Sequence, residues 1–249
     1  MFFNAAKYKS QLTRKAPSSY ADSVYKLAGE DRPSPRRLSQ AIMRGEDGMP
    51  SARNLTTMFA FFGQVVSSEI LMASEPGCPI EMHKIEIEKC DEMYDQDCKG
   101  GRTMPFHRAL YDSRTGQSPN MPREQINLVT SWIDGSFVYS TSETWLNTMR
   151  TFRNGTFISE HNGKFPPKNR DRVPLMNAPP AHHIKMISPE RMFLLGDART
   201  NQNPALLAFG ILLFRWHNVL AQRIASEYPD WSDEDIFQRA RRLVIASLQ

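Results

Sequence analysis

The chain has 249 residues, of which 40% are hydrophobic, so it is long enough for one large globular domain or two small ones. Its 31 basic and 27 acidic residues give a net charge of +4 and are scattered, which argues against a basic stripe that follows a nucleic-acid backbone. The most apolar run, Ala205 to Phe214, is about half of the ~20 residues that a membrane span needs, and the residues after Met1 lack the apolar core of a signal peptide. The sequence therefore predicts no nucleic-acid partner, no membrane span and no leader.

The first half of the chain is predicted to combine an arm, one long helix and loops. Residues 1–52 are rich in Ser, Pro, Arg and Lys, which favours an extended arm wrapped on a core. In residues 53–73 apolar side chains recur at helical spacing without a proline, which predicts a buried helix. Residues 76–125 alternate Pro, Gly and charged residues, so we expect loops and a short hairpin near Ile85 and Ile87.

The second half is predicted to be helical with one long excursion. Residues 124–152 form a helical stretch that a D-G-S turn interrupts, and residues 154–190 hold six prolines and form a surface excursion. Asn203 and a first-turn proline begin a helix that runs to Ile224. Ser232 begins the last helix with a capping box and acidic residues that complement the helix dipole. The fold class is therefore mainly α with long irregular loops.

The cysteines and the glycosylation sequons bear on the compartment of the chain. Cys78, Cys90 and Cys98 fit no zinc spacing, so one disulfide and one free thiol are expected, with the pairing open. Acceptor sequons occur at Asn54 and Asn154, and they matter only if the chain is secreted.

The segment F-F-G-Q-V-V-S-S-E, residues 61–69, resembles the distal-helix motif of animal haem peroxidases, in which F-G-Q is followed by two apolar residues and Asp-His-Asp. The resemblance implies that Gln64 belongs to the distal pocket and that Ser67 occupies the position of a haem ester link. It implies further that Ser68 replaces the distal histidine that transfers protons and that Glu69 is a calcium ligand. A serine cannot act as that acid and base near neutral pH. The resemblance therefore predicts that Ser68 is inactive in peroxide cleavage, and the alternative is that both serines are small polar residues at a helix contact.

The segment N-L-V-T-S-W-I-D-G-S-F-V-Y-S presents oxygen atoms at alternate residues, which suits a hard cation with about six to eight oxygen ligands. It resembles the calcium loop of the same family, which implies that Glu69 completes the site and that the tryptophan contributes its backbone carbonyl. Without the resemblance, a D-G-S turn is more often a plain loop. The implied loop ligands are Thr130, Trp132, Asp134 and Ser136.

A third segment, L-L-G-D-A-R-T-N-Q-N-P followed by F-R-W-H-N-V-L-A, resembles the family pattern G-D-x-R-x-x-E and L-x-R-x-H-N-x-L-A. The resemblance implies that Arg199 is the distal arginine, which stabilises charge that develops as peroxide cleaves. It implies that Gln202 stands where the second ester-forming carboxylate lies, so both covalent haem links are lost. His217 corresponds to a structural histidine of the helix rather than to an iron ligand.

The resemblance extends over residues 16–249, and the motifs S-S-Y-A-D-S-V-Y, P-G-C-P and Y-P-D-W-S-D-E-D make it most similar to the peroxidase-homology region of dual oxidases. It implies an animal haem-peroxidase-like helical domain over 53–249 that is truncated, since the C-terminal helices and the proximal histidine are expected further along. Haem b and Ca²⁺ are the implied cofactors. The implied setting is the extracellular face of the plasma membrane or the secretory lumen, with oxidase modules that make hydrogen peroxide and a maturation protein as partners.

Two functions remain open at this point. The first is a peroxidase-family oxidoreductase domain of a dual oxidase, impaired or silent by itself; the alternative is a non-catalytic, calcium-stabilised extracellular interaction module. Ser68 and the missing proximal histidine favour silence. The helices over 204–225 and 232–248 are also expected to expose an apolar patch and to require a partner.

Overall fold

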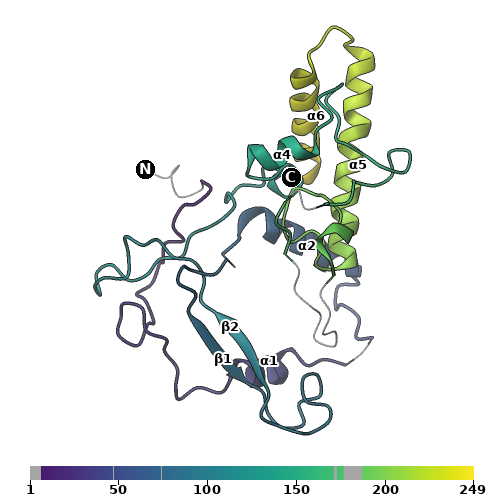
Figure 1. Cartoon of the computed structure of the whole chain (residues 1–249). Helices are drawn as coiled ribbons and strands as arrows, with labels where there is room; N and C mark the ends of the chain where they lie inside the picture. The colour runs from purple at the N-terminus through teal and green to yellow at the C-terminus, as the bar shows by residue number, and fades with distance from the viewer. Residues whose placement is uncertain (1–6, 47, 74, 171–172, 177–186) are drawn as a thin grey trace.

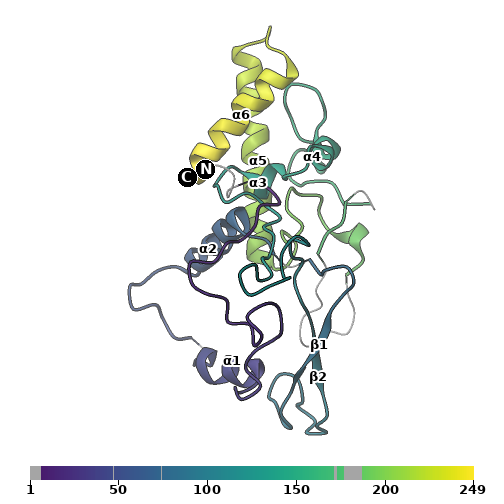
Figure 2. The ribbon, with the colours of Figure 1, turned by 90° about the vertical axis from the view of Figure 1, so that its left-hand side faces the viewer.

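The computed structural model describes residues 7–46, 48–73, 75–170, 173–176 and 187–249. Its helices gather around the long hairpin of α5 and α6, while α1 and a two-stranded sheet lie at the opposite end of the molecule (Figures 1 and 2). The elements in chain order are α1 (Pro35–Met43), α2 (Thr57–Ile70), β1 (Met82–Glu86), β2 (Thr103–His107), α3 (Ser136–Tyr139), α4 (Glu143–Met149), the 3₁₀ helix η2 (Pro189–Arg191), α5 (Pro204–Glu227) and α6 (Asp233–Leu248). The mainly α fold class is thus confirmed.

The two long helices begin where the sequence predicts. The side chain of Asn203 accepts a hydrogen bond from the Leu206 backbone at 2.8 Å, and Pro204 occupies the first turn of α5. The Ser232 hydroxyl accepts from the Asp235 backbone at 3.2 Å at the start of α6. These caps satisfy backbone donors that a helix start leaves free.

An aromatic cluster fills the core between α5, α6 and the segment before them. The ring of Phe157 stacks on Phe214 with centroids 5.4 Å apart, and Tyr139 and Phe237 meet Phe157 at 5.7 and 5.6 Å. Only 1% of Phe157 is exposed. The prediction of a surface excursion over 154–190 is therefore wrong at its start, because this aromatic side chain is a central part of the core.

The prediction of a helical stretch over 124–152 is wrong in its first half. Only α3 and α4 are helical there, and the backbone before them pairs with distant segments instead. The Asn127 amide donates to the Ser10 carbonyl at 2.9 Å, and the Leu128 amide donates to the Met72 carbonyl at 2.7 Å. Tertiary partners thus replace the local bonds of a helix.

Helix α2 is present as predicted, but the prediction that it is buried is wrong for much of its surface. Phe59 is 62% exposed and Phe62 is 38% exposed. Phe62 approaches Phe209 of α5 with ring centroids 6.1 Å apart, and Leu212, one turn further along α5, is 59% exposed. The apolar patch that the sequence predicts for α5 therefore extends onto α2. The buried residues of α2 are Val65, Ser68 and Glu69.

The prediction of a wholly extended arm over 1–52 is wrong at α1. Ser34 accepts a hydrogen bond from the Arg37 backbone, and Pro35 follows it at the first turn, so a cap and a compatible proline start the helix. Arg36 then forms a two-point ion pair with Asp91, with nitrogen–oxygen distances of 2.7 and 2.9 Å. This pair attaches α1 to the loop between the strands.

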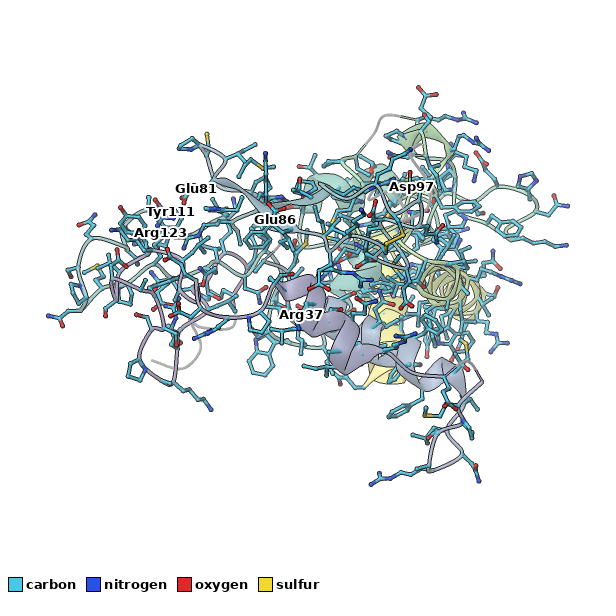
Figure 3. The ribbon with its side chains drawn as sticks, turned by 90° about the horizontal axis from the view of Figure 1, so that it is seen from below. Arg37, Glu81, Glu86, Asp97, Tyr111 and Arg123 are labelled. Carbon is cyan, nitrogen blue, oxygen red and sulfur yellow. A yellow bond between two sulfur atoms is a disulfide. The ribbon has the colours of Figure 1, made fainter. Side chains whose placement is uncertain are left out.

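The rest of the arm is attached by arginine contacts. Figure 3 shows Arg123 beside Glu81 and Tyr111, and the same guanidinium lies 4.6 Å from the ring centre of Tyr25 in the arm. Arg14 of the arm pairs with Glu124 at 2.7 Å. The arm is thus wrapped on the core, as predicted.

The strands β1 and β2 form the predicted hairpin, with Ile85 paired to Met104. The loop between them is closed by a disulfide between Cys90 and Cys98, while Cys78 is an exposed free thiol. The expected count of one disulfide and one free thiol is confirmed.

Helix α5 is long and apolar enough to cross a membrane. This corrects the prediction of no such segment, which considered only the run from Ala205 to Phe214. Nevertheless, the helix packs against α2, α3 and α6 and carries core residues such as Leu206 and Ala221, both with 0% exposure. These contacts identify α5 as a central core helix.

Candidate functional site

The carboxylate of Glu69, near the end of α2, binds the beginning of α3. Its Oε2 accepts hydrogen bonds from the backbone amides of Gly135 and Ser136 at 2.9 and 3.0 Å, and its Oε1 accepts from Phe137 at 3.0 Å. Gly135 permits this turn because its φ is +78°, a conformation that disfavours other residues. Glu69 is completely buried, so these amides are its replacement for water.

A second carboxylate, Asp134, lies beside the first. Its Oδ2 accepts from the Thr130 hydroxyl at 2.8 Å and its Oδ1 accepts from the Ser136 amide at 3.0 Å. The Thr130 hydroxyl also lies 3.4 Å from the carbonyl oxygen of Trp132, whose indole is exposed. The structure therefore brings together the five residues that the resemblance assigns to calcium.

Burial raises the pKa of Glu69 to about 7; the backbone hydrogen bond from Phe137 opposes this shift, and the negative charge of Asp134 adds to it. In the described part of the chain no basic side chain forms an ion pair with Glu69 or Asp134. Two close carboxylates without a positive partner form a site that a cation would stabilise.

The chemistry of the donors fits Ca²⁺ better than a transition metal. The site offers carboxylate, hydroxyl and carbonyl oxygens, which hard cations prefer. Among the described residues there is no group of three or more His, Cys, Asp and Glu side chains that could hold a metal. The fit to calcium thus depends on the neutral oxygens of Thr130, Trp132 and Ser136 as much as on the two carboxylates.

The residues of the implied distal pocket are arranged for helix contacts. The hydroxyl of Ser68 donates to the Gln64 carbonyl of its own helix at 2.9 Å, and Ser68 is only 4% exposed. The Gln64 side chain accepts from Asn203 at 3.0 Å, while Ser67 and Gln202 are exposed. Ser68 thus has the role of a small polar residue at a helix contact, which is the alternative stated above for the two serines.

Arg199 is held by its own segment and by α2. Its Nε and Nη2 donate to the two oxygens of Asp197 at 2.9 and 2.7 Å. Nη2 also donates to the Ser68 carbonyl at 2.7 Å, and Nη1 donates to the Leu71 carbonyl at 2.6 Å. The guanidinium that the resemblance assigns to peroxide cleavage thus makes four hydrogen bonds within the protein.

The described residues fit a catalytic haem poorly. The ester positions carry the hydroxyl of Ser67 and the amide of Gln202, and neither supplies a carboxylate. The histidine position of the distal helix carries Ser68, whose hydroxyl is already engaged. We therefore derive no peroxide-cleaving step from these residues.

His217 has the structural role that the sequence predicts. Its Nε2 lies 2.9 Å from the Gly155 carbonyl, which only accepts, so Nε2 carries the proton and Nδ1 accepts from the Tyr139 hydroxyl at 2.9 Å. Burial lowers its pKa to about 4. Both ring nitrogens are occupied, which leaves none for iron. The histidines at positions 182 and 183 lie outside the described residues.

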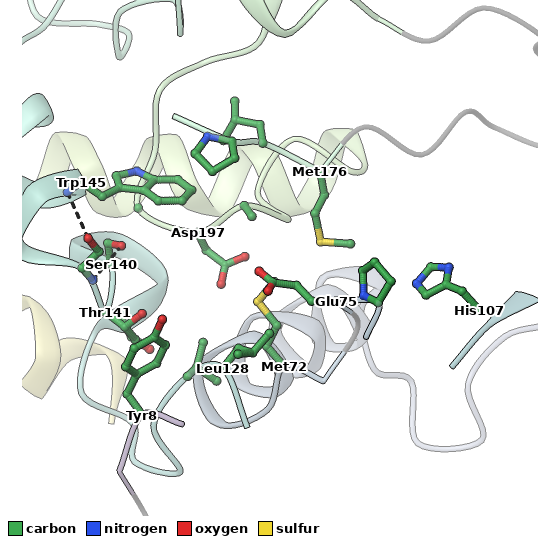
Figure 4. A pocket seen from close by; sticks show the side chains of 18 residues that line it. Tyr8, Met72, Glu75, His107, Leu128, Ser140, Thr141, Trp145, Met176 and Asp197 are labelled. Atoms are coloured by element: carbon green, nitrogen blue, oxygen red, sulfur yellow. Dashed lines mark hydrogen bonds between the residues drawn. The ribbon is translucent and has the colours of Figure 1, made fainter. Parts of the chain in front are cut away.

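A cavity of about 600 Å³ is lined by Asp197, by Tyr8 of the arm and by the segment after α3. Figure 4 shows Tyr8, Met72, Leu128 and Trp145 around it, with Asp197 at the wall. Gln64, Ser67, Ser68, Arg199 and Gln202 are not among its lining residues. The cavity is thus separate from the implied distal pocket.

Sequence reasoning missed two buried residues that support the site. Asn127 has 0% exposure and bonds to the end of α2, and Asp197, with 5% exposure, orients Arg199. The available signals were the Asn that begins the segment 127–140, here named the cation loop, and the Asp of G-D-x-R. The sequon residues Asn54 and Asn154 are both exposed.

Comparisons with known proteins identify the family of the chain. The family model described as animal haem peroxidase matches residues 4–249. The chain is 67% identical over 240 residues to a dual oxidase of Drosophila melanogaster and 42% identical over 241 residues to dual oxidase 1 of Homo sapiens. Each alignment covers 96% of this chain and 16% of the relative. The chain thus spans about a sixth of the length of these relatives.

Solved structures show the same fold. Peroxidase A from Dictyostelium discoideum matches with a TM-score of 0.82 and 27% identity over 97% of this chain and 47% of that one. A fatty acid alpha-dioxygenase of Arabidopsis thaliana matches with a TM-score of 0.70 and 18% identity over 98% of this chain and 33% of that one, which shows the fold alone. The chain therefore belongs to the animal haem peroxidase family. Within this family it corresponds to the peroxidase-homology domain of dual oxidases.

Proposed function

We propose that this chain is part of a dual oxidase that produces hydrogen peroxide, and that its own peroxidase-type pocket does not cleave peroxide. The observation that carries the proposal is the state of Ser68 and Arg199. Ser68 donates its hydroxyl to a helix carbonyl, and Arg199 is bound to Asp197 and to α2. Peroxide cleavage requires a group that moves a proton between the two oxygens, and neither residue can supply it.

If haem enters this domain, the chain holds it without a covalent link. Ser67 and Gln202 could only contact such a group, because a hydroxyl and an amide replace the ester-forming carboxylates of the family. The haem would supply redox chemistry, and Gln64 would be a polar side chain of its distal pocket. The domain then serves the oxidase as a folded extracellular module, and glycans at Asn54 and Asn154 are compatible with that location because both side chains are exposed.

We also propose that the domain binds Ca²⁺ through Glu69, Asp134 and the oxygens of Thr130, Trp132 and Ser136. Support comes from the convergence of these oxygens and from two carboxylates that have no basic partner among the residues that the structure describes. The ion would join α2 to the start of α3. An interaction module outside the oxidoreductases is less favoured, since the relatives compared above are named as oxidases and peroxidases.

The test uses a full-length dual oxidase that carries this domain. After haemin addition, the Soret band and the peroxide-dependent oxidation of guaiacol are measured, with catalase-sensitive peroxide release as the control for the oxidase. We expect peroxide release without guaiacol oxidation. The matched variant restores the three family side chains together: Ser67→Asp, Ser68→His and Gln202→Glu. Strong guaiacol oxidation by the parent protein would overturn the proposal.

A further inference from the structure

We propose that Arg199 and Asn127 are positioning residues for the cation at Glu69, which gives the family's catalytic arginine a structural task in this chain. The inference depends on the proposed cation site. The last turn of α2, like the last turn of any helix, has carbonyl groups without partners in the helix itself. Two side chains from separate segments bind this turn on either side of Glu69.

Arg199 supplies the first contact. Its Nη2 donates to the carbonyl of Ser68, directly before Glu69, at 2.7 Å, and its Nη1 donates to the carbonyl of Leu71 at 2.6 Å. These two bonds fix the backbone immediately before Glu69 and two residues after it. The position of the Glu69 carboxylate therefore depends on the position of the guanidinium.

Asn127 supplies the second contact from the cation loop. Its Nδ2 donates to the Ile70 carbonyl at 3.0 Å, and its Oδ1 accepts from the amides of Met72 and Val129 at 2.9 and 3.3 Å. The side chain thus joins the end of α2 to the start of the loop that carries Thr130. Because Asn127 has 0% exposure, no water competes for these bonds.

Asp197 fixes the orientation of Arg199. Its Oδ1 accepts from both the backbone amide and the Nε of Arg199, at 2.7 and 2.9 Å, and its Oδ2 accepts from Nη2 at 2.7 Å. The pair is almost neutral as a unit, so the arginine can lie near the site without strong repulsion of a cation. Only a planar fork can bind Asp197 and two carbonyls together, which a lysine cannot do.

The experiment measures Tb³⁺ luminescence sensitised by tryptophan, with Ca²⁺ as the competitor, on the full-length dual oxidase that carries this domain. The signal of Glu69→Gln is subtracted as the blank for other cation sites. Trp132 lies in the loop, so its indole is a suitable donor. We expect Arg199→Lys and Asn127→Ala each to weaken Ca²⁺ affinity by about tenfold or more, as is usual for residues that orient metal ligands. Arg223→Lys, the same change at an exposed position of α5, is the matched control and should bind as the parent does.

Thermal melting separates positioning from general destabilisation. A merely structural role would lower Tm equally with and without Ca²⁺, whereas a positioning role reduces the rise in Tm that Ca²⁺ produces. If Arg199→Lys does not fold, Asn127→Ala alone decides the question. Parent affinity in both variants would overturn this inference and leave the cation site intact. A parent signal no larger than that of Glu69→Gln would overturn the cation site and this inference together.

Discussion

The Nη2 atom of Arg199 lies 2.7 Å from the carbonyl oxygen of Ser68. Arg199, at the position of the family's distal arginine, thus binds the backbone of Ser68, at the position of the family's distal histidine. In this chain Arg199 and Ser68 both stabilise the end of α2, so their replacement should change the free energy of unfolding.

Replacement of Arg199 by Ala should lower the free energy of unfolding by about 3–5 kcal/mol, because it leaves the buried carboxylate of Asp197 without its partner. Urea denaturation followed by circular dichroism measures this change. The double variant Arg199→Ala with Asp197→Ala should cost less than the sum of the single changes, since the pair acts as one unit. Strict additivity would show that the ion pair contributes little.

Replacement of Glu69 by Gln should remove the response of the domain to calcium. An amide has one oxygen in place of two, so at least one of the three backbone amides that bind Glu69 loses its acceptor. We expect a loss of about 1–3 kcal/mol from this unsatisfied donor in the absence of calcium. A chelator should lower the Tm of the parent and leave that of Glu69→Gln unchanged. A variant that still gains stability from Ca²⁺ would contradict the assignment of Glu69.

Stability should fall between about pH 6.5 and pH 4 through His217. Burial lowers the pKa of His217 in the folded chain to about 4 from an ordinary value of 6.5, so the unfolded chain binds the proton first as the pH falls. This stabilisation is fully present above the unfolded pKa, and about 3 kcal/mol of it is lost once the pH has fallen through the folded pKa.

The pH dependence can be separated from that of the carboxylates with His217→Gln. This variant should be less stable than the parent at pH 7.5, because it disturbs the bonds to Tyr139 and Gly155. Its free energy of unfolding should nevertheless change less between pH 7.5 and pH 4.5. Equal slopes for parent and variant would show that His217 is not the group responsible.

Arg150 should be important for the attachment of α6. Its side chain is 6% exposed and pairs with Asp233 and Glu234, both at 2.6 Å, while its guanidinium lies 4.0 Å from the Phe237 ring centre. Arg150→Ala should therefore cost about 3–5 kcal/mol in chemical denaturation. Glu234→Gln is the matched control; the side chain of Glu234 is 58% exposed, so this change should cost about 1 kcal/mol or less. Similar losses for both changes would refute the proposed importance of burial.

Gly135→Ala should destabilise the turn between the cation loop and α3. A Cβ atom there would lie 2.9 Å from both Ile245 and Tyr139, and the φ of +78° already disfavours it. We expect a loss of about 2–4 kcal/mol, whereas Gly101→Ala, with a φ of +68° and no neighbour within 4 Å, should lose about 1 kcal/mol. Thermal melting of both variants tests the difference, which would vanish if only the backbone conformation mattered.

Much of the fold follows from local signals in the sequence. Asn203 and Ser232 mark the starts of α5 and α6, because capping depends on residues within one turn of each other. Helix α1 was missed although it has the same kind of start at Ser34, since the prolines of the arm suggested extended backbone. The burial of Phe157 could not be predicted, because it depends on Phe214 and Phe237, which lie far along the chain.

The family and the replacement of the acid–base histidine by Ser68 could be read from residue identity and order alone, because both depend on which residue stands at which position. What Arg199 does depends on the folded chain. The same guanidinium could face a haem pocket or bind the protein, and the choice was made by Asp197 and by the carbonyls of α2, which approach it from a segment more than a hundred residues earlier in the chain.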